Sequence, residues 1–187
     1  MDRNRKVQER FNKFQSMNSA NLERILNSLV DPNKCAVLGV FPSDLIPDHM
    51  EKYPNCFIVN TDPSSMPGQH WVAYYFDSEL EYEFFDSYGF PPSFSSLPYS
   101  SPSIFNTHSL QSSTSAVCGQ FCLYYLNSKA RGIDMKSMIH SFSLSNKIWN
   151  DKFVRKFVSQ IALPKRLYNS NAKFIQTSYS FILFRRS

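Results

Sequence analysis

Two aromatic-rich runs constrain the fold of this 187-residue chain more than any other feature. They occupy residues 70–76 (HWVAYYF) and 81–85 (EYEFF), and the short segment 77–80 (DSEL) separates them. Aromatic and β-branched residues favour strands, and two such runs joined by about four residues predict an antiparallel hairpin. We therefore expect a β-sheet that contains this hairpin.

The predicted hairpin brings two polar residues together at its open end. A turn centred between residues 78 and 79 places Trp71 opposite Asp86 and His70 opposite Ser87. Diagonal neighbours on paired strands lie close enough for long side chains to meet, so we expect His70 to contact Asp86. Taken alone, His70 is also typical of a packed or surface histidine, and Asp86 of a residue that caps the next turn.

Other segments predict short strands and helices. Residues 37–41 (VLGVF) and 56–59 (CFIV) are apolar runs typical of buried strands. Residues 21–30 have apolar side chains at helical spacing and are followed by Asp-Pro, and a second such helix is predicted between Ser145 and Pro164. The apolar positions are Leu22, Ile25, Leu26 and Leu29 in the first helix and Trp149, Phe153 and Phe157 in the second.

A further helix is predicted to begin at Cys118. Its apolar stripe consists of Cys118, Phe121, Cys122, Tyr125 and Leu126. A thiol at a helix start meets the positive end of the helix dipole and free backbone N–H groups, which favour the thiolate. Gly119 leaves room for a substrate carbonyl to approach its backbone N–H. A lone cysteine beside a glycine is more typical of core packing than of catalysis, and we interpret Cys122 as a core thiol.

Four polar residues, in the order His70, Asp86, Gln111 and Cys118, provide the groups that a cysteine hydrolase needs. The thiolate attacks a carbonyl carbon, the imidazole transfers protons, and the carboxylate orients the imidazole. The amide of Gln111, seven residues before Cys118, can donate to the oxyanion. Gln111 alone would be an ordinary loop residue, but the ordered set indicates cysteine-type hydrolysis.

Composition favours one globular domain, because 42% of the residues are hydrophobic and the chain is long enough to bury a core. No apolar run approaches the roughly 20 residues of a membrane span, and the N-terminus is polar, so we expect neither a membrane segment nor secretion and therefore an intracellular protein. The net charge of +5 is concentrated at residues 3–6, 165–166 and 185–186. Solubility explains this charge most simply, and weak attraction to nucleic acid such as DNA, or to an acidic partner, is the functional alternative.

The four cysteines and four histidines show no paired spacing of the kind that binds zinc. We therefore expect no metal and no cofactor. Two disulfides are possible by number, but the chain lacks a secretory context, and one helical turn between Cys118 and Cys122 is a poor spacing for a disulfide.

Three motifs resemble those of the adenovirus-type cysteine proteases, in the broad class that includes the proteases of ubiquitin-like proteins. They are GQHWVA at 68–73, FFDSYGF at 84–90, and SAVCGQFC at 115–122 with Gln111 seven residues before its first cysteine. The resemblance covers roughly residues 20–130. It implies an α+β fold of the papain-like or adenain-like type, in which a central helix that carries the nucleophile packs on a mixed β-sheet.

The resemblance also implies a role for each matching residue. Cys118 is the expected nucleophile and His70 the general base and acid. Asp86 is expected to orient His70, while the Gln111 amide and the Cys118 backbone N–H form the oxyanion hole. Relatives favour small residues, especially glycine, before the scissile bond.

Two further residues are expected to contact substrate. Trp71 is expected to form a wall of the substrate groove, with core packing as the alternative, and Gly119 is expected to lie beside the reacting carbonyl. The adenovirus enzymes often have Glu where this chain has Asp86. They also bind an activating peptide through a cysteine where this chain has Ser100, so that activation does not carry over.

The resemblance is compatible with several functions for a single protease domain over residues 1–187. We expect residues 1–20 to be flexible, residues 20–130 to form the catalytic core, and residues 131–187 to be helical. Similar proteases occur in Maverick/Polinton transposons and related viruses, where capsid precursors are the expected substrates and the nucleus, a virion or a virus factory the expected location. A cellular deubiquitinase or modifier isopeptidase, and a catalytically silent interaction module, are the alternatives.

Overall fold

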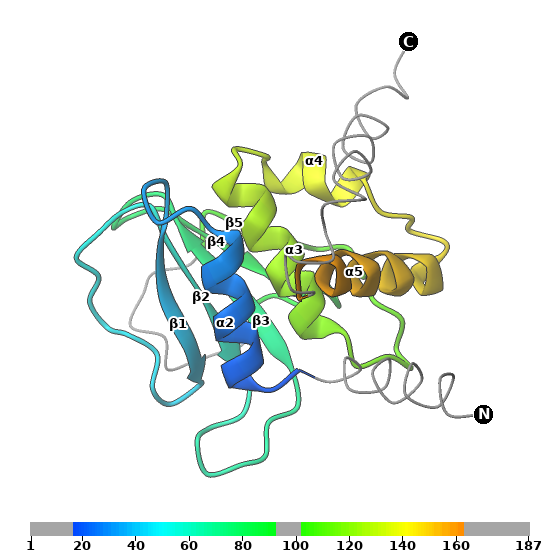
Figure 1. Cartoon of the computed structure of the whole chain (residues 1–187), viewed down its shortest axis with the longest axis horizontal. Coiled ribbons are helices and arrows are strands. Elements are labelled where there is room, and N and C mark those ends of the chain that lie inside the picture. Colours follow the sequence, from blue (N-terminus) through cyan, green and yellow to red (C-terminus); the bar gives the residue numbers. More distant parts are fainter. Residues whose placement is uncertain (1–16, 93–101, 163–187) are drawn as a thin grey trace.

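A computed structural model of the chain describes residues 17–92 and 102–162 (Figure 1). Within these residues five strands form one sheet: β1 (Ala36–Pro42), β2 (Asn55–Asn60), β3 (Trp71–Phe76), β4 (Tyr82–Phe85) and β5 (Ile104–Phe105). The helices of the same part of the chain are α2 (Ser19–Leu29), α3 (Cys118–Ala130), α4 (Met135–His140) and α5 (Lys147–Ala162).

The sheet is mixed, with the strand order β1-β2-β3-β4-β5. The central pairs β2–β3 and β3–β4 are antiparallel, and the outer pairs β1–β2 and β4–β5 are parallel. Helix α2 packs on β1 and α3 on β3, while α4 and α5 pack on α3 (Figure 1). The predicted α+β fold, with a central helix on a mixed sheet, is therefore confirmed.

The sheet is buried on both faces because alternate side chains of its strands enter different cores. One core lies under the helices and takes Cys56, Ile58, Ala73, Tyr75 and Phe85 from the strands. The other includes Phe57, Val59, Val72, Tyr74, Phe76 and Phe84, together with Met50 from the connection between β1 and β2. This arrangement explains why the central strands read as nearly continuous apolar runs.

Helix α3 is buried on nearly every side, so the predicted apolar stripe is only part of its buried surface. All residues from 118 to 128 are buried, since the sheet covers one side and α2, α4 and α5 contact the others. Polar side chains inside this helix need internal partners. Ser128 Oγ, for example, donates to the carbonyl of Tyr124 at 2.8 Å.

The other predicted elements are present with small differences in extent. Helix α2 begins at Ser19, two residues earlier than predicted, because Asn18 caps it by accepting from the N–H of Asn21 at 2.9 Å. In α5 the most deeply buried apolar residues are Val154 and Val158, whereas Trp149 is 46% exposed. No sequence pattern delimited α4, which lies within the segment expected to be helical, and none predicted β5; these two elements have only six and two residues.

The β3–β4 hairpin is confirmed, but its predicted register is wrong by one residue. Phe76 pairs with Tyr82, so the loop consists of the five residues 77–81 instead of four. The backbone N–H groups of the first two loop residues both donate to the carbonyl of Glu81, at 3.1 and 3.4 Å. The turn is therefore centred on a residue and not between two residues.

The corrected register improves the placement of the predicted histidine–carboxylate pair. When this register is continued past the ends of the strands, Val72 lies opposite Asp86, whereas the predicted register placed Trp71 there. His70 is two residues from Val72 and therefore lies on the same face as Asp86. The N–H of Thr61 donates to the carbonyl of His70 at 2.8 Å and extends the β2–β3 pairing to this position.

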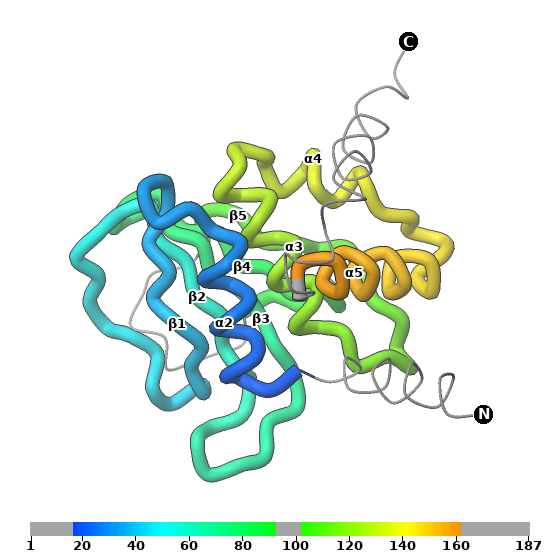
Figure 2. Tube along the Cα trace, viewed as in Figure 1, coloured from blue at the N-terminus to red at the C-terminus, as the bar shows by residue number. Residues whose placement is uncertain are grey.

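Some predictions lie outside the described residues. These are the flexibility of residues 1–16, the position of Ser100, the basic groups at both ends and the helical character of residues 163–187. Among the described helices, none combines the length and apolar character that a membrane span requires. Figure 2 shows the connection from β2 to β3 beside the N-terminal end of α2, where the candidate site lies.

Candidate active site

The structure brings His70 and Asp86 into direct contact. His70 Nε2 lies 2.8 Å from Asp86 Oδ1, and only 16% and 6% of the two side chains is exposed. A carboxylate at this distance fixes the tautomer in which Nε2 carries the proton and leaves Nδ1 as the proton acceptor. The dyad is therefore oriented for general base chemistry.

A tight turn after β4 holds the Asp86 carboxylate in place. Asp86 Oδ1 also accepts from the backbone N–H of Tyr88 at 2.8 Å, and the Asp86 carbonyl accepts from the N–H of Gly89 at 2.9 Å. Gly89 has a φ of +77°, and a Cβ there would lie 2.7 Å from the backbone carbonyl carbon of His108. Only glycine satisfies both the dihedral and the close approach of the two backbones.

The imidazole of His70 also faces Cys118. Burial is the largest influence and lowers its pKa, but hydrogen bonds to Asp86 and Cys118 and the charges of both groups outweigh burial and raise the pKa of His70 to about 9. An imidazolium is therefore favoured at neutral pH. A cation beside a thiol stabilises the thiolate, which is the nucleophilic form of cysteine.

Cys118 is the first residue of α3, as predicted, and is 7% exposed. Its N-cap residue, Val117, has no side chain that could accept from the first N–H groups of the helix. The positive end of the helix dipole is therefore directed at the sulfur without a side-chain cap. Cys122 differs, because burial is the main cause that raises its pKa well above the usual range and keeps the thiol protonated.

Gln111 is buried beside the same site, and its side-chain amide is held by three hydrogen bonds. Its Oε1 accepts from Ser87 Oγ at 2.7 Å. Its Nε2 donates to the carbonyl of Ser115 at 2.7 Å, just before the helix that Cys118 begins, and to the hydroxyl of Tyr88 at 3.2 Å. The amide is thus anchored between the turn after β4 and the segment that precedes α3.

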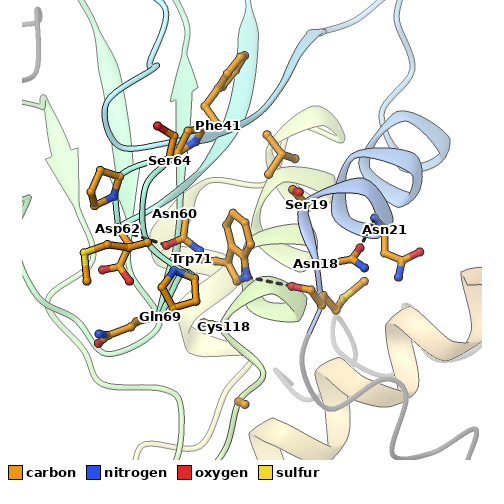
Figure 3. Close-up of a pocket in the computed structure, with 18 residues that line it drawn as sticks. Asn18, Ser19, Asn21, Phe41, Asn60, Asp62, Ser64, Gln69, Trp71 and Cys118 are labelled. Carbon is orange, nitrogen blue, oxygen red and sulfur yellow. Dashed lines mark hydrogen bonds between the residues drawn. The ribbon is translucent and has the colours of Figure 1, made fainter.

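A groove of about 690 Å³ reaches Cys118 from the N-terminal end of α2 and the β2–β3 connection. Trp71 forms part of its wall, and its Nε1 donates to the carbonyl of Met17 at 3.1 Å. Its contact with substrate stays a prediction. Figure 3 shows Trp71 between Asn60 on one side and Asn18 on the other. A second hollow of about 340 Å³ adjoins His70 and Asp86.

Gly119 is placed where the close contact of two helices requires a glycine. A Cβ at this position would lie 2.9 Å from Leu22 Cδ2 of α2 and 3.4 Å from Trp71 Cδ1. The groove lining includes Cys118 and Trp71 but not Gly119. Helix packing is therefore one reason for this glycine, and its contact with substrate stays a prediction.

Sequence reasoning missed two residues of the site, Tyr88 and Ser87. Both contact Gln111 through their hydroxyl groups, and the ring of Tyr88 stacks on His70 with centroids 5.0 Å apart. Their position immediately after Asp86, before a glycine, was a usable signal. An aspartate often accepts from the backbone N–H two residues later, which turns the following residue back over it.

No family model and no curated protein matches this sequence. Solved structures do match. The ASFV pS273R protease aligns with a TM-score of 0.55 and 14% identity over 78% of this chain and 68% of that chain. The chain has the fold of this protease. The selenomethionine form of the same protease aligns with a TM-score of 0.52 and 14% identity over 76% and 67% of the two chains. At 14% identity, the similarity to both structures shows a shared fold and nothing further.

Proposed function

We propose that the protein is a cysteine endopeptidase of the adenain-like type. One observation carries the proposal: the imidazole of His70, bound to Asp86 at 2.8 Å on one side, faces the thiol of Cys118 on the other. A nucleophile, a base and a group that orients the base, in contact and in this order, form the catalytic triad of a hydrolase. The protease fold of the structural neighbours supports the same conclusion.

Hydrolysis proceeds in two halves. The Cys118 proton passes to His70 Nδ1 when the thiolate–imidazolium pair forms before attack, and the thiolate Sγ then attacks the carbonyl carbon of the scissile peptide. The tetrahedral intermediate collapses, the imidazolium protonates the departing amine, and an acyl-enzyme remains. His70 then takes a proton from water, whose oxygen attacks the thioester carbonyl, and Cys118 leaves as the thiolate. The carboxylate of Asp86 stabilises the imidazolium in both halves.

The oxyanion of each intermediate is assigned to the N-terminal end of α3. The backbone N–H of Cys118 lies at the positive end of the helix dipole, and the Gln111 amide supplies a second donor. One Gln111 N–H already binds the Ser115 carbonyl at 2.7 Å, so the N–H held more loosely by Tyr88, at 3.2 Å, is the one that turns to the oxyanion. A charged acceptor replaces a neutral hydroxyl there, which strengthens the bond as charge develops.

Cleavage within a chain, and not only at its end, is favoured by space on both sides of the site. The groove that reaches Cys118 can hold the residues before the scissile bond, with Trp71 restricting that position to small residues such as glycine. The hollow beside His70 and Asp86 can hold residues after the bond. We further propose that the substrates are capsid precursors of a virus or a Maverick/Polinton-type transposon, processed in the nucleus, a virion or a virus factory, with weak DNA attraction through the basic ends.

Peptide turnover tests the function. The substrates are internally quenched peptides with a central Gly-Gly, paired with otherwise identical peptides with a central Val-Val. We expect cleavage of the Gly-Gly peptides alone. Cys118→Ala should abolish it, and the matched control Cys122→Ala, which removes a protonated core thiol one turn away, should retain it. Cleavage that survives Cys118→Ala would refute the mechanism.

The same proteins distinguish the alternative functions. Incubation with ubiquitin and ubiquitin-like activity probes tests the isopeptidase hypothesis. These probes label a nucleophilic cysteine only when the protein binds the folded modifier that the probe carries. Probe labelling of Cys118 without peptide cleavage would replace the endopeptidase by an isopeptidase. Absence of both, with a Cys118 that iodoacetamide does not alkylate faster than Cys122, would indicate an interaction module.

A further inference from the structure

Tyr88 touches three of the residues assigned to the reaction through three different groups. Its backbone N–H donates to Asp86 Oδ1 at 2.8 Å, the same oxygen that binds His70. Its ring stacks on the imidazole with an interplanar angle of 29°. Its hydroxyl accepts from Gln111 Nε2 at 3.2 Å. No other described residue that the structure places at the site has contacts to all three.

We propose that Tyr88 is a positioning residue of the site, whose ring orients the imidazole of His70 and whose hydroxyl orients the amide of Gln111. This inference rests on the proposed function. It assigns Tyr88 no contact with substrate, and its two groups act on different steps. The ring acts on proton transfer between His70 and Cys118, whereas the hydroxyl acts on the oxyanion donor.

The ring contact suits an imidazole that carries charge. Aromatic rings attract cations at their faces, and ring centroids 5.0 Å apart lie in the range of favourable stacking. The ring is also a physical wall, because it closes one side of an imidazole that Asp86 holds by a single nitrogen. Without it, His70 can rotate about that hydrogen bond and move Nδ1 away from Cys118.

The hydroxyl contact determines where the second N–H of Gln111 points before substrate binds. The hydroxyl itself has one further, weak contact, a donation at 3.5 Å to the carbonyl of Ser115, which also accepts from Gln111. Burial, followed by the charges of Cys118, Asp151 and Asp86, raises the pKa of Tyr88, so the hydroxyl stays neutral. A neutral acceptor holds the N–H in place and yields it to an oxyanion at little cost.

Separate substitutions test the two contacts with the quenched Gly-Gly peptide. Tyr88→Phe keeps the ring and the backbone N–H, so we expect kcat to fall about fivefold, the equivalent of one hydrogen bond, with KM unchanged within about twofold. Alkylation of Cys118 by iodoacetamide, which needs no oxyanion hole, should keep its rate. Tyr88→Leu also removes the ring, so relative to Tyr88→Phe it should slow both turnover and alkylation by about tenfold.

A double-mutant cycle identifies the partner of the hydroxyl. In a Gln111→Ala background, Tyr88→Phe should have no further effect on kcat, because the amide it orients is gone. The matched control is Tyr125→Phe, which removes a buried hydroxyl that donates to Glu83 at 2.9 Å, away from the site, and should leave kcat within about twofold.

Two results would overturn the assignment: a kcat for Tyr88→Phe equal to that of Tyr125→Phe, or the same loss with and without Gln111. If Tyr88→Phe does not fold, Ser87→Ala replaces it. This variant removes the 2.7 Å hydrogen bond to Oε1 of the Gln111 amide. An unchanged kcat would refute the role of amide orientation. A wild-type protein that cleaves no peptide refutes the proposed function itself. An active wild type with either of the two results above refutes only the inference.

Discussion

Protonated His70 should contribute roughly 3 kcal/mol to the free energy of unfolding, and raising the pH from 6 to 10 should remove this contribution. The pKa of this imidazole is about 9 in the folded protein against 6.5 for the unperturbed group. Because the folded pKa is the higher one, protonation favours the folded state. The contribution is complete below pH 6.5 and is lost as the pH rises to about 9. Each pKa unit corresponds to about 1.36 kcal/mol, which gives the stated magnitude for this largely buried side chain.

Chemical denaturation at a series of pH values measures this effect. The quantity to follow is the difference in unfolding free energy between the native protein and His70→Gln, since titrating groups that do not contact His70 contribute equally to both. We expect the difference to decrease from pH 6.5 to 9. Cys118→Ala should move the decrease to lower pH, because it removes two of the influences that raise the pKa of His70. A difference that stays constant from pH 6 to 10 would refute the assigned pKa and the contacts behind it.

Two further predictions concern stability. Gly89→Ala should lower the free energy of unfolding by more than Gly132→Ala. Both glycines have positive φ (+77° and +80°), but only at Gly89 would a Cβ lie against a neighbouring backbone. Equal losses in denaturant titrations would contradict this clash. Lys129→Met should cost about 3–5 kcal/mol, because Glu83 is buried and would lose its cation at 2.8 Å, and the double variant with Glu83→Gln should recover part of that loss.

The sequence allowed the fold class and the placement of Cys118 to be predicted, because both depend on ordered motifs and helical spacing. The hairpin register was not predictable to one residue. The loop DSELE contains no Gly, Asn or Pro to specify a turn type, and the register depends on backbone bonds from residues 77 and 78 to the Glu81 carbonyl. A one-residue error matters here, because side chains alternate between faces with a period of two.

The contacts of Gln111 escaped prediction for a different reason. The sequence gives its distance along the chain from Cys118, but its orientation depends on hydroxyl groups of Ser87 and Tyr88, which lie more than twenty residues earlier. Such contacts form only when the segment before α3 docks on the turn after β4. Neither the periodicity of the sequence nor local propensity indicates that these two segments dock on each other. The residues that orient an active site are therefore harder to predict than those that react.

The turn after β4 therefore sets the geometry of the site more than the sheet does. Backbone bonds join it to the segment before α3, because the Ser87 carbonyl accepts from the N–H groups of Leu110 and Gln111 at 2.8 and 3.0 Å. Asn106 adds a side-chain bond from Nδ2 to the Asp86 carbonyl at 2.7 Å. Since backbone atoms form most of these links, side-chain substitutions in the turn, except at Gly89, should leave its path largely unchanged. The spacing between the dyad and the oxyanion donor is thus fixed by the backbone, and side chains such as Tyr88 adjust only orientation.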